Sequence, residues 1–215
     1  VVMAKTSPGE RHRGITAFLV EADREGFEPT KIDNKLGIRA SDLAEIRLDD
    51  VRVPEDNVIG AVDQGFYQLM AFFAGGRTSV AAQAVGAAQG ALDAAVEYAE
   101  EREQGGQAIK EYQAISHKVA EMATNVEAAR SLTYRAASVV DDDGNDQLAA
   151  KFASMAKLFA SERAVEVADE GIQVHGGAGF VTDHPAERFY RDARITKIYE
   201  GTSEIQKNII SDQVF

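Results

Sequence analysis

The chain has 215 residues, of which 45% are hydrophobic, and it carries a formal net charge of −12. This composition predicts a folded protein with one or two cores. The acidic balance argues against nucleic acid as the main partner, because binding phosphates needs a basic face. No apolar run approaches the roughly 18 residues of a membrane span, and the N-terminus lacks a basic segment followed by an apolar one. We therefore expect a soluble, cytoplasmic protein with no membrane span.

Cysteine and histidine, the residue types that bind zinc and similar metals, are scarce. The sequence has no cysteine, which excludes disulfides, thiolate nucleophiles and cysteine metal sites. No two histidines have the i, i+4 spacing that places a pair of ligands on one helix face. We therefore expect no metal site. The histidines are His12, His117, His175 and His184.

The residue pattern changes along the chain, from one typical of strands to one typical of helices. Residues 15–20 are rich in β-favouring side chains, and residues 43–54 alternate apolar with polar, so the first 58 residues are typical of strands and turns. From about residue 63 onward, alanine-rich segments with 3.6-residue periodicity and almost no proline predict helices. We expect three long helices, followed by two short ones. Their ranges are about 63–102, 110–140, 146–174, 185–192 and 203–213.

The breaks between the long helices hold glycines and short polar residues, "EQGGQ" at 103–107 and "DDDGND" at 141–146. The second helix has one apolar stripe, which predicts a core face. Antiparallel neighbours with short connections predict an up-and-down four-helix bundle, so the fold class is α+β. The stripe consists of Ile115, Val119, Met122, Val126 and Ala129.

Two glycine-containing segments each allow two interpretations. "QVHGGAGF" at 173–180 ends a long helix, and its glycines either cap that helix or let a ligand lie against bare backbone. "EEREQGGQ" at 100–107 places Arg102 just before a turn. Its guanidinium can clamp a pyrophosphate, or it can simply complement the helix dipole.

The segment "IYEGTSEIQ" at 198–206 poses a sharper question. Thr202 or Ser203 can cap the last helix, and Glu204 can complement its dipole in the first turn. That interpretation does not account for Glu200, which follows apolar residues and precedes Gly201.

Taken together, these segments resemble the acyl-CoA dehydrogenase family over nearly the whole chain. The similar segments include "KLGIRASDLAEIRLDDVRVPEDNVIG", "GGRTSVAAQAVGAAQGALDAAVEYAEER", "FASMAKLFASE", "GIQVHGGAGF" and "RFYRDARITKIYEGTSEIQ". The resemblance implies a partial, barrel-like strand domain at 1–58, the C-terminal part of the family's middle β domain, and a four-helix bundle domain at 59–215. The family's N-terminal helical domain has no counterpart here, so we expect a fragment or the presented part of a longer chain.

The resemblance also implies a reaction. Glu200 would be the base that removes the α-proton of an acyl-CoA, while hydride leaves the β-carbon for FAD and a trans-2-enoyl-CoA forms. Gly201 would let the thioester lie close, and Arg77 would contact the substrate. A second class of the family carries its base at the position of Gly76, so this sequence is similar to the commoner class.

The cofactor and the partners are implied in the same way. The resemblance implies FAD, an electron-transfer flavoprotein as electron acceptor, and a homotetramer in which FAD is shared between subunits. The sequence departs from the family at Gly105, where phenylalanine is usual, and at Asp212, where arginine is frequent. Two alternatives remain open: an acyl-CoA oxidase, and a truncated, flavin-free fragment that only oligomerises. The implied cofactor contacts are Arg102, Gln113, Gln173, Gly176 and Gly177 across the subunit boundary, and Thr202 and Glu204 within the subunit.

Overall fold

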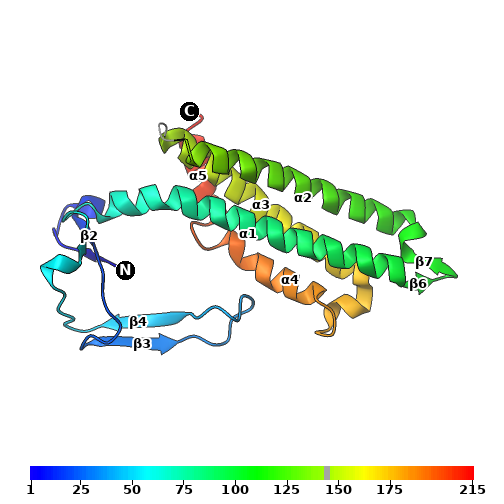
Figure 1. The fold of residues 1–215 in the computed structure, drawn as a ribbon, viewed down its shortest axis with the longest axis horizontal. Helices are drawn as coiled ribbons and strands as arrows, with labels where there is room; N and C mark the ends of the chain where they lie inside the picture. Colours follow the sequence, from blue (N-terminus) through cyan, green and yellow to red (C-terminus); the bar gives the residue numbers. More distant parts are fainter. Residues whose placement is uncertain (143–145) are drawn as a thin grey trace. The chain divides into compact units, whose positions relative to one another are not determined.

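The computed structural model describes residues 1–142 and 146–215 (Figure 1). The chain forms two compact units, residues 1–35 with 39–73 and residues 36–38 with 74–215. Helix α1, Gly65–Glu101, begins in the first unit and continues into the second. A domain boundary between residues 58 and 59 stays a prediction.

The first unit contains two small antiparallel sheets. One has the strand order β1-β2-β5, with Val2 opposite Phe18 and Phe18 opposite Val58. The other pairs β3 with β4. The alternating pattern at 43–54 forms a strand only as far as Leu48, because Asp50 has a left-handed φ of 54° that ends the extended run. The strands are β1 Val2–Lys5, β2 Ile15–Phe18, β3 Phe27–Lys31, β4 Ala44–Leu48 and β5 Val58–Ile59.

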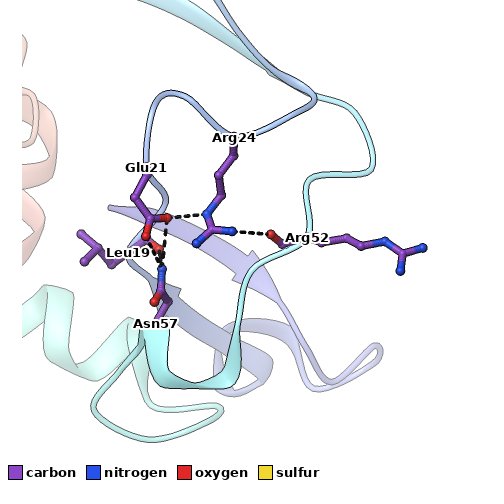
Figure 2. Close-up of polar contacts among 5 residues, drawn as sticks. All are labelled: Leu19, Glu21, Arg24, Arg52 and Asn57. Carbon is purple, nitrogen blue, oxygen red and sulfur yellow. Dashed lines mark hydrogen bonds and ion pairs between the residues drawn. The ribbon is translucent and has the colours of Figure 1, made fainter.

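Two loops of the first unit are tied together by a polar network around Glu21 (Figure 2). The Glu21 carboxylate accepts hydrogen bonds from the guanidinium of Arg24 and, at 3.1 Å, from the amide of Asn57. These bonds lower the pKa of Glu21 to about 2. Arg24 also donates to the main-chain carbonyl of Arg52 at 3.1 Å, and Asn57 to that of Leu19 at 2.8 Å. The network fixes the path of the chain between β2 and β5.

The second unit is a helical bundle. In Figure 1, α2 runs antiparallel to α1 and α3 runs antiparallel to α2, and the shorter α4 and α5 pack on α3. The α+β class and the up-and-down bundle are therefore confirmed, with helix ends within a few residues of those expected. Part of the predicted break at 141–146 falls on residues 143–145, outside the described residues. The helices are α2 Gln113–Val140, α3 Asp146–His175, α4 Ala186–Ala193 and α5 Ser203–Asp212.

The bundle core is built mainly from small side chains. Met122, Val126 and Ala129 are at most 2% exposed, which confirms the predicted stripe of α2, and Ile115 and Val119 pack at its edge. Alanines dominate the buried surfaces of α1 and α3, and the backbone of α3 lies close to those of α2, α4 and α5. These alanines include Ala81, Ala84, Ala88, Ala91, Ala95, Ala156, Ala160 and Ala164.

Candidate active site

The loop that carries Glu200 has an unusual backbone. Between the 3₁₀ turn Arg194–Lys197 and α5, Glu200 has a φ of 52° and Gly201 a φ of 91°. A left-handed conformation is uncommon for a residue with a side chain and is often found where structure serves function. Thr202 then starts α5: its hydroxyl accepts a hydrogen bond from the backbone N–H of Ile205 at 3.4 Å. The cap therefore belongs to Thr202 and leaves Glu200 unexplained.

The carboxylate of Glu200 has one buried oxygen and interacts with a buried arginine. Its Oε2 atom is buried and has no hydrogen-bond partner within the described part of the chain. Arg77 of α1 is only 6% exposed and interacts electrostatically with Glu200. Burial lowers the pKa of Arg77, and the negative charge of Glu200 acts in the opposite direction. A buried carboxylate oxygen with no internal donor keeps its lone pairs available to a proton from a ligand.

Gly201 is required for two local reasons. Its φ lies in the region that favours glycine, and a Cβ there would lie 2.6 Å from the side-chain nitrogen of Gln206. Both reasons concern the loop itself. A contact between Gly201 and a substrate stays a prediction.

Two buried polar residues next to this loop were not found from the sequence. Lys157 of α3 and Gln206 of α5 are both fully buried. Lys157 Nζ donates to the Gly201 carbonyl at 2.6 Å, and Gln206 Nε2 donates to the same carbonyl at 2.9 Å and to that of Glu200 at 3.2 Å. The sequence held a signal for Lys157, because it lies on the helical stripe of Ala153, Ala156, Ala160 and Ala164, where an exposed lysine is not expected.

Three of the predicted cofactor residues lie together at the C-terminal ends of α1 and α3. Arg102, Gly176 and Gly177 line an open cavity of about 680 Å³, together with aromatic side chains that include Tyr98 and Tyr112. Gln113, the first residue of α2, and Gln173, near the end of α3, are exposed and do not line it. Thr202 and Glu204 lie at the start of α5, next to Glu200 in the chain. The predicted residues thus fall into two separate groups, one around the cavity and one at the start of α5.

The turn after Arg102 is a regular hairpin despite the departure at Gly105. Strands β6, Glu103–Gln104, and β7, Gln107–Ala108, form a hairpin around Gly105 and Gly106, which have φ values of 64° and 87°. Consecutive positive φ values are those of a type I′ turn, which glycines favour. The Tyr112 hydroxyl closes the hairpin by donating to the Gln104 carbonyl at 2.8 Å.

The cavity has the chemistry of a site for a cofactor with a diphosphate and aromatic rings. A Cβ added at Gly176 or Gly177 would meet nothing within 4 Å, so their bare backbone faces open space. Arg102 supplies a guanidinium that suits phosphate oxygens, and Tyr98 and Tyr112 supply aromatic faces. The residues present therefore fit FAD. Among the described residues, no group of three or more His, Asp or Glu side chains is arranged to hold a metal ion.

None of the helices in residues 1–142 and 146–215 is both long enough and apolar enough to cross a membrane.

Comparison with known proteins identifies the family. The family model described as acyl-CoA dehydrogenase, C-terminal domain, matches residues 63–215. The chain is 47% identical over 211 residues to the human mitochondrial short-chain specific acyl-CoA dehydrogenase, covering 98% of this chain and 50% of that protein. It is 44% identical over 211 residues to subunit CarC of the caffeyl-CoA reductase-Etf complex of Acetobacterium woodii, covering 98% and 55% respectively. The chain belongs to the acyl-CoA dehydrogenase family.

A solved structure extends the comparison to the fold. Butyryl-CoA dehydrogenase from Megasphaera elsdenii superposes with a TM-score of 0.94 at 40% identity, covering 99% of this chain and 55% of that one. The chain spans about half the length of the curated relatives it matches.

Proposed function

We propose that this chain is the catalytic-base half of an FAD-dependent acyl-CoA dehydrogenase, which converts an acyl-CoA to a trans-2-enoyl-CoA. The observation that carries the proposal is the buried Oε2 of Glu200, which has no hydrogen-bond partner among residues 1–142 and 146–215, in a left-handed loop that interacts electrostatically with Arg77. Family membership and the names of the relatives support the same reaction. Because the relatives are about twice as long, the activity is proposed for the full-length protein.

In the proposed reaction Glu200 accepts the proton from the carbon next to the thioester carbonyl. FAD, when bound, supplies the acceptor for the two electrons and the hydrogen that leave the β-carbon. Arg77 contributes a buried positive charge beside the carboxylate, and Gly201 leaves the loop without a side chain next to the base. General-base catalysis of this kind contributes roughly 10²–10⁴-fold to the rate.

The residues proposed to hold the cofactor come from both groups. Arg102 would contact the diphosphate, and Gly176 and Gly177 would lie against the cofactor from a neighbouring subunit. Thr202 and Glu204 would contact the cofactor of their own subunit, in addition to capping α5. The two groups belong to one site only if subunits pair, so we propose a homo-oligomer, a tetramer as in the resemblance. The remaining contacts proposed across the subunit boundary are Gln113 and Gln173.

An electron-transfer flavoprotein is the proposed acceptor, because the related CarC is named as a subunit of a complex that contains Etf. The two alternatives remain distinguishable from this proposal. An acyl-CoA oxidase would share the residues of the first half-reaction, and a flavin-free oligomerising fragment would share only the bundle.

The test is anaerobic titration of the purified full-length protein with acyl-CoAs of graded chain length. Bleaching of the flavin band with formation of enoyl-CoA supports the proposal, and the chain length that bleaches fastest defines the acyl specificity. Rapid reoxidation by air would favour the oxidase. A colourless protein that binds no added FAD would refute the proposal.

A further inference from the structure

The buried lysine of α3 has no role in the reaction proposed above. Lys157 is 0% exposed, although a lysine is almost never fully buried unless it is paired. The charged groups that act on it are Arg77 of α1, Glu200 of the preceding loop and Glu204 of α5. The ammonium therefore lies inside the site, and its burial must be offset by contacts there.

Lys157 contacts the loop that carries Glu200, and the conformation of this loop sets the direction of the Glu200 carboxylate. Lys157 Nζ donates to the Gly201 carbonyl at 2.6 Å, directly after the left-handed Glu200. Holding a residue with a side chain at positive φ costs on the order of 1–3 kcal/mol and persists only where the surroundings fix it. A short, charge-assisted bond from a rigid helix is such a constraint.

The hydrogen bond from Gln206 does not replace the one from Lys157. Its amide also reaches the Gly201 carbonyl, but Gln206 belongs to α5, the helix that the loop itself leads into. Lys157 belongs to α3, which packs against both α2 and α5 in the bundle. In the described part of the chain, the Lys157 bond is what joins the Gly201 carbonyl to α3. It therefore fixes the loop relative to the bundle core, whereas the Gln206 bond fixes it relative to α5, the helix that follows the loop.

We propose that Lys157 is a positioning residue for proton abstraction, which holds the Glu200–Gly201 step on α3 so that the Glu200 carboxylate points at the substrate. The proposal rests on the proposed function of Glu200 as the base. It predicts that loss of the lysine slows the chemical step while substrate binding and folding are largely kept. A purely structural lysine would show the opposite pattern.

The experiment compares two substitutions in the full-length, flavin-loaded protein. Lys157→Met keeps an unbranched apolar stem, one atom shorter than that of lysine, and removes the donor. Lys157→Gln has the same reach as methionine and keeps a polar end, which stops one atom short of the position of Nζ. The matched control is Lys151→Met, the same change at a half-buried position of the same helix. Stopped-flow reduction by butyryl-CoA gives the rate constant per bound flavin and the substrate dependence, and a thermal melt reports folding.

We expect both Lys157 variants to reduce their flavin about 10–100-fold more slowly, as for a displaced catalytic group, with KM changed less than about threefold. Lys151→Met should behave like the parent. A Lys157 variant that reduces flavin at the parent's rate, whatever its melting temperature, overturns the proposal. Glu200→Gln, measured beside them, separates the two hypotheses: if it also keeps the parent's rate, the base assignment fails, and if it alone is slow, only the role of Lys157 fails.

Discussion

The imidazole of His175 stacks on the phenol ring of Tyr98, with ring centroids 4.4 Å apart and an angle of 26° between the planes. His175 Nδ1 also lies 2.7 Å from the Gly171 carbonyl. Burial lowers the pKa of His175, which favours the neutral ring in the stack. The ring stack joins the end of α3 to the end of α1, and Gly176 and Gly177, which follow His175, line the same cavity as Arg102.

A side chain at Gly177 should therefore block the cofactor without unfolding the protein. In Gly177→Val the new methyl groups enter open space beside the backbone, so we expect little change in the thermal melt. The cavity loses the volume next to Arg102, and we expect flavin affinity to fall at least about tenfold, or about 1.4 kcal/mol. Flavin content and FAD titration of the stripped protein measure this.

Gly86→Val is the matched control, because a Cβ at Gly86 of α1 also meets nothing within 4 Å and Gly86 does not line this cavity. It should keep the parent's affinity for FAD. If Gly177→Val and the parent bound FAD with equal affinity, the cavity would not be part of the cofactor site.

Thr202 should contribute to stability as a helix cap. Thr202→Ala removes the acceptor for the Ile205 N–H, a long bond of 3.4 Å, so we expect a loss of about 0.5–1 kcal/mol of unfolding free energy. Thr202→Ser keeps the acceptor and should lose much less. Urea unfolding of the three proteins measures the difference. If the alanine and serine variants were equally stable, the hydroxyl would have no capping role.

Lys157 should make stability depend on pH in the alkaline range. Burial, then the charge of Arg77, lowers the pKa of Lys157 to about 8, against the charges of Glu200 and Glu204, which raise it. Between about pH 8 and the pKa of the unfolded state, near 10.4, the unfolded chain binds more protons at this site than the folded one. Stability attributable to Lys157 therefore rises with pH across this window, since the cost of burying a charged ammonium is relieved.

The measurement is urea unfolding of the parent and of Lys157→Met at pH 7 and pH 9.5. Other groups titrate in both proteins, so the difference between them isolates the lysine. We expect the parent to gain stability relative to the variant on going to pH 9.5. A constant difference would show that the lysine has no lowered pKa.

The helices were predictable because their signals are local. Alanine-rich periodicity and the glycines at 105 and 106 placed the ends of α1 and α2 within a few residues. The same glycines predict a helix stop and a turn, and the structure adds that the turn closes the short hairpin β6–β7. At residues 43–54 the alternation predicted a longer strand than β4, because the pattern carries no information about the left-handed Asp50.

The resemblance names candidate site residues, whose roles stay predictions, but it gives no geometry for them. The resemblance singled out Glu200, and the structure adds its positive φ and its buried oxygen, which depend on packing between α3, α5 and the loop. Lys157 was missed because lysine is ordinarily a surface residue. Its burial follows from the small side chains around it on α3, a tertiary effect that no single position reveals.

The central claim is that Glu200 is the base, and Glu200→Gln in the full-length protein tests it most directly. The amide keeps the volume and loses the ability to accept the α-proton, so flavin content and the thermal melt should stay close to those of the parent. Glu121→Gln, at an exposed glutamate of α2, is the matched control and should reduce its flavin normally. Anaerobic bleaching by butyryl-CoA should slow at least about 10²–10⁴-fold in Glu200→Gln, a barrier increase of about 3–5 kcal/mol. A Glu200→Gln protein that bleached at the parent's rate would contradict the account.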